Sequence, residues 1–381
     1  MKITEIRGYH VGFSLAEPIG NAVTFMTQRE FLMLEVVTDA GITGWGDVGA
    51  APHPAAAFIR SRLARILLGQ SPLETGRLWQ AMTAVLNYDR RGVGTMGISA
   101  VDLALHDISA KAQGISVAAL LGGAVRDRVF AYASGPFMIP GNSPYARFEA
   151  EVEGYCHRGF RGIKPRGGFS PRADGAMAIA LRKQLGPDVA LMVDFNRGYT
   201  APAAIEAARR MDEAGLLWIE EPVLPEDVPG YQAFTRIVPT AVAGGEALGS
   251  LAAYREFFVA NCLAVVQPDL TVCGGYSGMR RVAALAQAFD LPVMPHVFGT
   301  TINYHASLQM AAVLEGRRGG GPMPYPFMEV DVTPNPLLAL GGDPALNDDG
   351  TITVPGAPGT GLELTGEQLK PWTRSSWTER L

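Results

Sequence analysis

The sequence predicts an α/β protein whose main part is a (β/α)₈-type barrel, with a smaller α+β unit before it. Short apolar runs alternate with alanine-rich helical stretches such as residues 202–215 and 278–290, a pattern typical of a parallel sheet with crossover helices. Eight such runs are enough to close a barrel, whose chemistry lies at the carboxyl ends of its strands. The runs are residues 128–135, 161–167, 189–196, 216–223, 240–246, 263–269, 291–298 and, after a longer gap, 326–332.

The segments on either side of the barrel have other patterns. Residues 3–15 and 29–39 are strand-like, and residues 41–45 supply a hairpin turn signal. Helical patterns follow at residues 53–69 and 99–114. The tail is rich in Pro, Gly and Asp and contains a second hairpin-like element. We therefore expect an α+β unit at residues 1–125, the barrel at 126–332 and a C-terminal segment at 333–381 that packs back on the first unit.

The composition limits the classes of partner. The 381 residues are 48% hydrophobic, which is enough for a large core and two domains. A net charge of −5, without a basic cluster among aromatic residues, argues against a nucleic acid or an anionic membrane as partner. The first residues are charged and lack an apolar segment, so we expect no signal peptide. No run of about eighteen apolar residues occurs, so we expect no membrane span. Because Cys156, Cys262 and Cys273 are widely spaced, we expect free thiols in a cytoplasmic protein. We further expect a homo-oligomer that acts on a small molecule.

Three acidic residues end three consecutive apolar runs: Asp194, Glu220 and Glu246. Both intervals are 26 residues, about the length of one βα unit. Carboxylates at neighbouring strand ends repel each other unless a cation lies between them. Oxygen ligands favour a hard ion, Mg²⁺ first, with Mn²⁺ as the alternative. Three unrelated surface acids would be the ordinary interpretation, but spacing, position and chemistry together favour a metal site.

Other charged residues end the remaining strands. Asp269 ends the sixth run and His296 the seventh, and a carboxylate beside an imidazole fixes its tautomer and raises its basicity. Glu329 ends the eighth run. Lys164 and Arg166 share one face of the second strand, where two cations suit a substrate carboxylate. Each residue alone has an ordinary interpretation, as a core histidine, a surface acid or a solvated basic pair. Together they indicate an active site.

With these residues the sequence resembles the enolase superfamily, specifically the mandelate racemase subgroup of acid-sugar enzymes. The resemblance covers nearly the whole chain. It implies a modified (β/α)₇β barrel and an N-terminal α+β capping domain that the C-terminal tail completes. It also implies that Asp194, Glu220 and Glu246 bind the metal, and that His296 and Asp269 form a catalytic dyad.

Further segments carry the resemblance within the subgroup. Glu329 matches the acid that the subgroup has at the eighth strand, and residues 99–114 resemble the segment before the barrel. Residues 295–300, 327–338 and 350–364 are most similar to galactarolactone cycloisomerases and to sugar-diacid dehydratases. The implied activity is therefore that of an acid-sugar lyase or isomerase.

One departure from the subgroup bears on the mechanism. The subgroup usually has Lys-x-Lys at the second strand, where the second lysine is a base, but this chain has Lys164-Pro165-Arg166. Arginine keeps its proton at any ordinary pH, whereas Lys164 remains a fixed cation beside the substrate carboxylate. The implied reaction is removal by His296 of the proton α to a carboxylate, with Mg²⁺ and Lys164 stabilising the enediolate. A β-elimination follows, as dehydration to a 2-keto-3-deoxy acid or as lactone ring opening. Glu329, protonated or hydrogen-bonded to the carboxylate, would assist.

Substrate contacts are hard to place from the sequence. In the resembled family the capping domain covers the barrel mouth with loops, here residues 18–26 and 49–56. Each candidate also has an ordinary interpretation as a loop residue, since asparagine after a strand is a common turn former. The candidates to contact polyol hydroxyls are Asn21, Thr24 and His53 in the loops, and Asn196 and Tyr199 just beyond the third strand.

Three other functions stay open at this point. A racemase or epimerase of a 2-hydroxy acid would need a second base or a mobile intermediate. A metal-dependent hydrolase on a barrel commonly has His-x-His after the first strand, and no such pair occurs among the six histidines. A sugar-acid binding protein without activity is disfavoured because nearly the full catalytic set is present.

Overall fold

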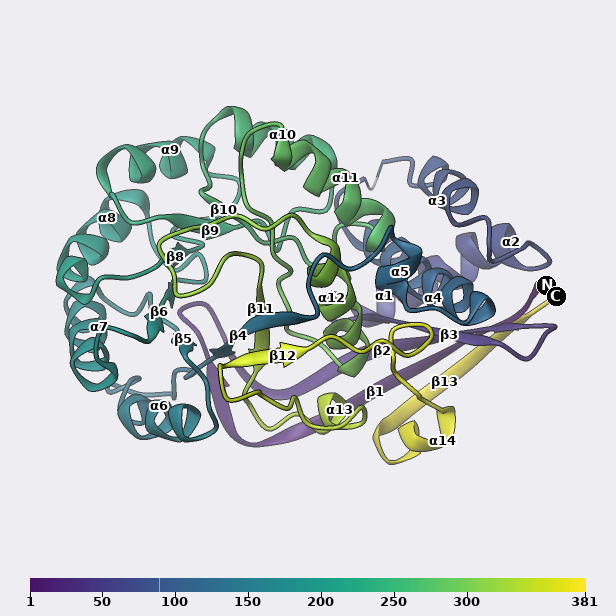
Figure 1. Cartoon of the computed structure of the whole chain (residues 1–381), viewed down its shortest axis with the longest axis horizontal. Helices are drawn as coiled ribbons and strands as arrows, with labels where there is room; N and C mark the ends of the chain where they lie inside the picture. The colour runs from purple at the N-terminus through teal and green to yellow at the C-terminus, as the bar shows by residue number, and fades with distance from the viewer. Residues whose placement is uncertain (89) are drawn as a thin grey trace.

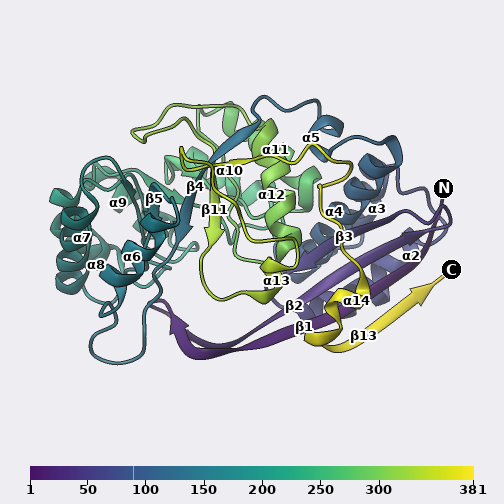
Figure 2. The same cartoon turned by 60° about the horizontal axis from the view of Figure 1, so that its bottom comes forward.

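The computed structural model describes residues 1–88 and 90–381, which form a helix-ringed barrel and an antiparallel sheet (Figure 1). The barrel lies at the left of Figure 1 and the sheet at the lower right, with both ends of the chain at its far end. The second view shows the long first two strands running from the chain ends to the barrel (Figure 2). The two units are thus joined along the sheet.

The sheet has the strand order β13-β1-β2-β3, and every pair is antiparallel. A long helix, α4, packs closely on β3 because Gly44 and Gly46 carry no side chain. A Cβ at these positions would lie 2.2 Å from the Ala104 carbonyl oxygen and 1.9 Å from that of Ala100. The elements of this unit are β1 (Ile3–Gly20), β2 (Phe25–Thr38), β3 (Thr43–Val48), α1 (Pro52–Phe58), η1 (Ile59–Leu63), α2 (Ala64–Leu67), α3 (Thr75–Ala84), α4 (Val93–Gln113), α5 (Val117–Leu120) and β13 (Thr373–Arg380).

The barrel has eight strand positions with parallel pairing, closed by β11 beside β4. β6 and β7 form one position interrupted at Met192, and the seventh position holds only the bridges of Val293 and His296 to the sixth. The strands are β4 (Arg128–Ser134), β5 (Gly162–Lys164), β6 (Ala190–Leu191), β7 (Val193–Asp194), β8 (Ile219–Glu220), β9 (Val242–Gly244), β10 (Val265–Val266) and β11 (Phe327–Asp331).

Seven crossover helices connect these eight positions within the described residues, so the predicted (β/α)₇β barrel is confirmed. Helix starts are encoded locally: Ser170, Asp227 and Ser250 each accept a hydrogen bond from a backbone N–H of the first turn. The helices are α6 (Phe148–His157), α7 (Pro171–Leu185), α8 (Ala201–Arg210) with η2 (Asp212–Ala214), α9 (Val228–Ile237), α10 (Leu251–Val259), α11 (Gly275–Gln287) and α12 (Thr301–Val313).

After the barrel the chain contacts both units. α13 (Pro336–Ala339) is followed by β12 (Thr351–Thr353), which pairs antiparallel with β4. α14 (Gly366–Leu369) and η3 (Lys370–Trp372) then lead to β13, which pairs with β1. The domain boundaries after residues 125 and 332 stay a prediction. In the part of the chain that the structure describes, no helix is long and apolar enough to cross a membrane.

The inside of the barrel is filled by large apolar side chains from successive strands. Phe130, Tyr132, Met192, Trp218 and Phe327 belong to one buried cluster there. Such packing leaves no open channel, so the chemistry is confined to the barrel ends. The charged residues predicted from the sequence lie at the carboxyl ends of the strands, above this layer.

Candidate active site at the barrel mouth

The structure brings the predicted catalytic and metal-binding residues together at the carboxyl ends of the barrel strands. Main-chain bridges join Arg166 to Asp194 and Asp269 to His296, and Asp194 is directly opposite Glu220 in the ladder between β7 and β8. These charged residues are therefore close together because the strands that carry them are adjacent. The residues of this charged group are Lys164, Arg166, Asp194, Glu220, Glu246, Asp269, His296 and Glu329.

Two cations and three carboxylates make up the most deeply buried part of this charged group: Lys164, Arg166, Asp194, Glu220 and Glu329. Lys164 is fully buried and forms ion pairs with Glu220 and, at 2.9 Å, with Glu329 Oε1. Burial alone would lower the pKa of Lys164, but Glu220 and Glu329 outweigh it and raise the pKa. Burial would raise the pKa of Glu329, but Lys164, His296 and Arg166 hold it well below its ordinary range. Glu329 is therefore ionised, not in the protonated form considered from the sequence.

Arg166 is held by three neighbours. Its Nη1 pairs with Asp194, its Nη2 donates to Ser134 Oγ at 3.0 Å, and its guanidinium carbon lies 4.4 Å from the centre of the Phe137 ring. The buried guanidinium would have a lowered pKa from desolvation alone, but Asp194 and the other carboxylates raise it. The residue stays charged, so it cannot accept a proton.

The carboxylates at this end outnumber the cations. Burial raises the pKa of Asp194 to about 7, Arg166 opposes this, and the nearby charges of Glu220 and Glu246 add to it. Glu220 also accepts hydrogen bonds from Gln267 Nε2 at 2.7 Å and from Trp218 Nε1 at 3.2 Å. The acids are Asp194, Glu220, Glu221, Glu246, Asp269 and Glu329, and the permanent cations that pair with them are Lys164, Arg166 and Arg197.

This donor set suits a hard divalent cation. Asp194, Glu220 and Glu246 supply oxygen only, and a cation would balance their excess negative charge. Among the described residues, however, no group of three side chains is already arranged around one metal position. Asp194 and Glu220 turn to Arg166 and Lys164, and Glu246 Oε2 lies 3.1 Å from His296 Nε2. The residues thus fit a metal by chemistry and position, while their side chains contact basic partners.

His296 and Asp269 form the predicted pair. His296 Nδ1 lies 2.8 Å from Asp269 Oδ2, whose other oxygen accepts from Thr271 N and Oγ1, both at 2.7 Å. Asp269 is therefore fixed and orients Nδ1, while Nε2 faces Glu246 Oε2 at 3.1 Å and is protonated in this arrangement. Burial would lower the pKa of His296, but Glu246, Glu329 and Asp269 raise it well above its ordinary value.

Asp47 connects the capping sheet to the start of α12, next to the His296–Asp269 pair. Asp47 on β3 accepts from Thr300 Oγ1 at 2.7 Å, and Thr300 caps α12 by accepting from Ile302 N. Asn303, in the first turn of α12, lies within 3.4 Å of Asp269 Oδ1. Burial raises the pKa of Asp47 to about 7. The capping unit therefore helps to position the start of α12 beside the His296–Asp269 pair.

A cavity of about 520 Å³ opens onto His296, Asp269 and Glu246. It lies between the barrel mouth and β2, since Arg29 and Phe31 line it as well. Sequence reasoning missed these strand residues because β2 reads as an ordinary strand. The other lining residues are Met26, Gln28, Glu30, Gly49, Ala50, Met96, Arg197, Ala247, Thr271, Val272 and Phe298.

The five predicted substrate contacts do not line this cavity. Asn21 Oδ1 accepts from Val23 N and Thr24 N, so Asn21 and Thr24 form a local turn. His53 stacks on His10 with ring centres 4.4 Å apart. His53 Nε2 also lies 3.8 Å from Glu30 Oε2, so His53 on α1 contacts side chains of β1 and β2.

Asn196 and Tyr199 have supporting contacts. Asn196 Nδ2 donates to Asp194 Oδ2 at 2.8 Å, and its backbone N–H donates to the other oxygen at 2.7 Å. Tyr199 donates to Asp174 Oδ2 at 2.7 Å, beside Tyr145, which binds the same carboxylate. In this structure Asn196 orients Asp194, and Tyr199 belongs to a network away from the cavity.

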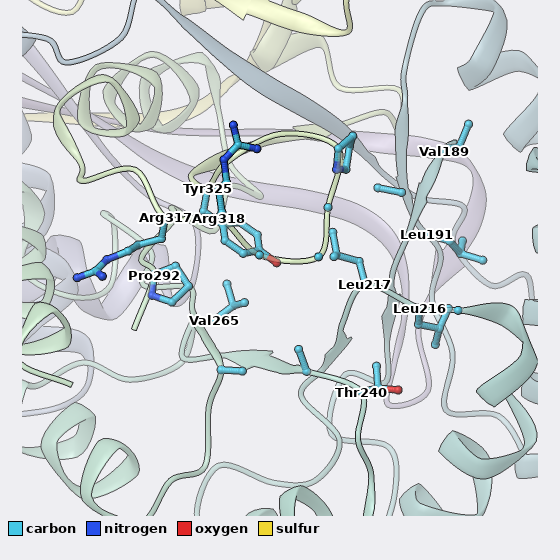
Figure 3. A pocket seen from close by; sticks show the side chains of 18 of the residues that line it. Val189, Leu191, Leu216, Leu217, Thr240, Val265, Pro292, Arg317, Arg318 and Tyr325 are labelled. Carbon is cyan, nitrogen blue, oxygen red and sulfur yellow. The ribbon is translucent and has the colours of Figure 1, made fainter. Parts of the chain in front are cut away.

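A larger cavity, of about 810 Å³, lies at the opposite end of the barrel (Figure 3). Leu217, Val265 and Tyr325 surround its opening, and Arg317 and Arg318 come from the loop before β11. The strands begin at this end, whereas the predicted reacting groups are at the strands' carboxyl ends. We therefore assign the chemistry to the smaller cavity, on charge and geometry.

Known proteins match the chain over most of its length. The profile "Mandelate racemase / muconate lactonizing enzyme, N-terminal domain" matches residues 3–122, and "Enolase C-terminal domain-like" matches residues 147–369. The chain is 34% identical over 372 residues to D-galactarolactone cycloisomerase of Agrobacterium fabrum, covering 97% of this chain and 98% of that protein.

Solved structures agree with the sequence matches. The 3,6-anhydro-D-galactonate cycloisomerase of Zobellia galactanivorans superposes with a TM-score of 0.88 at 29% identity, covering 98% of this chain and 100% of that one. L-Talarate dehydratase of Polaromonas sp. JS666, crystallised with Mg and L-glucarate, gives 0.85 at 30% identity, covering 100% and 99%.

Proposed function

The chain belongs to the mandelate racemase and muconate lactonizing enzyme family of the enolase superfamily, and from this premise we propose that it is a Mg²⁺-dependent acid-sugar lyase or isomerase. The proposed reaction removes the proton α to a carboxylate and then expels a β-leaving group. A hydroxyl leaving group gives a 2-keto-3-deoxy acid, and a ring oxygen gives an opened lactone. The observation that carries the proposal is the His296–Asp269 pair beside a buried group of carboxylates.

In this proposal Asp194, Glu220 and Glu246 hold the metal. Bound Mg²⁺, or Mn²⁺ in its place, would stabilise the negative charge of the enediolate electrostatically. Lys164 adds a fixed positive charge beside them, because its contacts with Glu220 and Glu329 keep it protonated. Glu329 in turn fixes the main chain next to the base, since its Oε2 accepts from Val297 N at 2.9 Å.

His296 is the proposed base. Asp269 holds its Nδ1 proton, so Nε2 takes the α-proton and carries it to the leaving oxygen when the geometry is syn. Glu246 now lies 3.1 Å from Nε2. If Glu246 bound the metal instead, its contact with Nε2 would be lost, the pKa of His296 would fall, and Nε2 would be free to take the α-proton.

Arg166 decides between elimination and racemisation. Inversion at the α-carbon requires proton delivery from the face opposite His296, and the subgroup provides a lysine there. Arg166 occupies that position with Asp194 and Ser134 as partners, and its raised pKa keeps the proton on the guanidinium. Loss of a β-leaving group needs no second base, so elimination is the reaction that these residues support.

A proton NMR time course in D₂O tests this reading. Both α-epimers of aldonic and aldaric acids and their lactones are incubated with the Mg²⁺-loaded enzyme. We expect consumption of one epimer with formation of a keto acid or ring-opened product. Rapid interconversion of the epimers without such a product would contradict elimination and favour a racemase.

A further inference from the structure

The turn that carries Asp269 forms one wall of the active-site cavity. Residues 269–274, which we call the Asp269 turn, lead from the sixth barrel strand to α11. Asp269, Thr271 and Val272 in this turn line the cavity. Asp269 also contacts the proposed base, because its Oδ2 lies 2.8 Å from His296 Nδ1. The position of the turn therefore decides how the imidazole of His296 is oriented.

Hydrogen bonds inside the turn make it a single rigid piece. The carbonyl oxygen of Asp269 accepts from Cys273 N at 2.8 Å. The carbonyl oxygen of Leu270 accepts from Gly275 N at 3.1 Å. Gly274, the last residue of the turn, has a φ of 100° and precedes the first residue of α11. A displacement of Gly274 is therefore passed on to Asp269 through this network.

Two side chains of the capping unit hold Gly274 by its main chain. Ser99 Oγ on α4 accepts from Gly274 N at 2.9 Å, and Trp79 Nε1 on α3 donates to the Gly274 carbonyl oxygen at 2.9 Å. Ser99 is fully buried, and its own hydroxyl donates to the Thr95 carbonyl oxygen at 3.0 Å. The guanidinium carbon of Arg281 lies 3.9 Å from the centre of the Trp79 ring. Both side chains are thus held in place by further contacts.

Asp102 holds the first turn of α11 from the same helix, α4, which packs beside α11 (Figure 1). Asp102 Oδ2 accepts from Ser277 N at 2.9 Å. A Cβ on Gly275 would lie 2.5 Å from this oxygen, so glycine permits the close approach of the two helices. His106 Nδ1 lies 3.3 Å from the same oxygen. Burial would lower the pKa of His106, but Asp102 raises it above its ordinary value. Buried polar contacts therefore fix α11 against α4.

The capping unit also reaches Asp269 from its other side. Asn303, in the first turn of α12, lies 3.4 Å from Asp269 Oδ1. Asp47 of β3 accepts from Thr300 at the start of that helix. Asp269 therefore lies between the starts of α11 and α12, and both helix starts are attached to the capping unit.

We propose that Ser99 and Trp79 are positioning residues, which fix Gly274 and so keep Asp269 Oδ2 in contact with His296 Nδ1. Neither side chain lines the cavity, so they act through the Asp269 turn and not on the substrate. The proposal rests on the proposed function, because His296 is the proposed base. It makes the capping unit part of the support for proton transfer, in addition to its place over the barrel mouth.

The test removes the two hydrogen bonds one at a time. Ser99→Ala removes the acceptor for Gly274 N, and Trp79→Phe removes the donor to its carbonyl oxygen but keeps an aromatic ring. Each variant is assayed with Mg²⁺ and the acid sugar that wild type turns over best. Each should lower kcat about 10- to 100-fold, because small displacements of reacting groups cost that much. KM should stay within about twofold, since neither residue contacts the substrate.

A second measurement does not depend on turnover. A proton shared between an imidazole nitrogen and a carboxylate gives a resonance far downfield in proton NMR spectra recorded in H₂O. His296→Asn identifies the resonance of His296 Nδ1 by its absence. Ser99→Ala and Trp79→Phe should both shift or weaken this resonance, because the distance to Asp269 Oδ2 changes. A role confined to stability would leave it unchanged.

Ser109→Ala is the matched control. Ser109 is also a buried serine of α4, and its Oγ donates to the Pro72 carbonyl oxygen at 3.2 Å, inside the capping unit. This variant should keep the wild-type kcat and the wild-type His296 resonance, even if its Tm falls. A loss of kcat as large as that of Ser99→Ala would show a general effect of α4 and overturn the proposal.

The remaining outcomes separate the positioning role from the function. Wild-type kcat in both variants, or a lower kcat with an unchanged His296 resonance, would overturn the positioning role and leave the proposed function standing. If Ser99→Ala does not fold, Trp79→Phe decides in the same way. If wild type turns over no acid sugar or lactone, the proposed function fails, and the resonance alone then decides whether Ser99 and Trp79 position Asp269.

Discussion

The two ends of the barrel are built from the same strands but hold different side chains. At the mouth, buried acids and bases contact one another, as Lys164 contacts Glu220 and His296 contacts Asp269. At the other end, the larger cavity is bounded by Leu217, Val265 and Tyr325 and by a glycine-rich loop. Arg317 there forms ion pairs with Asp290 at 3.3 Å and with Glu315 at 3.6 Å, both at the surface. We therefore place the proposed chemistry at the end where buried charges contact one another, and not at the end with the larger cavity.

Removal of the divalent metal from the barrel mouth should cause the largest loss of activity. Chelation with EDTA followed by desalting should abolish turnover, because Lys164, which already pairs with Glu220 and Glu329, would be the one remaining charge to stabilise the enediolate beside three carboxylates. Added Mg²⁺ should restore it. Full activity in protein shown by elemental analysis to be free of metal would contradict the metal site.

Loss of the base should have the next largest effect. His296→Asn should lower kcat by roughly three orders of magnitude or more, as expected for a base in a cooperating site. It should also stop exchange of the substrate α-proton with D₂O, measured by proton NMR. Exchange at the wild-type rate in this variant would place the base elsewhere.

Asp47 offers a smaller effect, on stability. Its folded-state pKa of about 7 lies above the ordinary value of 3.8, so the native protein binds this proton more tightly than the unfolded chain. The stability that it contributes is full below about pH 4 and is lost as the pH rises through about 7. Asp47→Asn, which has no such proton, should gain a few kcal/mol relative to wild type between pH 4.5 and 8.

Urea unfolding of wild type and Asp47→Asn at about pH 4.5 and about pH 8 measures this change in the free energy of unfolding. The exposed variant Asp343→Asn is the control and should follow the wild-type pH dependence. A constant difference between Asp47→Asn and wild type at both pH values would show that Asp47 is ionised throughout.

A substitution in the larger cavity, at the end of the barrel where the strands begin, should change activity least. Arg318→Ala removes a charged side chain from the larger cavity without touching the reacting groups. We expect kcat and KM within about twofold of wild type, as for surface substitutions away from special features. A loss comparable to that of His296→Asn would mean that the comparison between the two ends fails.

The sequence predicted what depends on strand spacing. Asp194 and Glu220 are directly opposite in the ladder because each ends its strand at the same point of the βα repeat. The spacing does not reveal contacts between distant segments. Arg29 meets Asp331 across 302 residues, and the sequence gives no local sign of it. The sequence predicts Tyr199 as a substrate contact, and it gives no local sign that the Tyr199 hydroxyl donates to Asp174 Oδ2 at 2.7 Å.

The pairing of β13 with β1 has a consequence for how the protein is made. Glu5 lies opposite Arg380, so β1 leaves the ribosome before the barrel and meets one of its neighbours only after the whole barrel has been synthesised. Until then one edge of β1 is open to other chains, and such an edge is a template for aggregation. A contact between segments so far apart also slows folding. Growth temperature and chaperone supply should therefore affect the yield of this protein more than the composition of its barrel suggests.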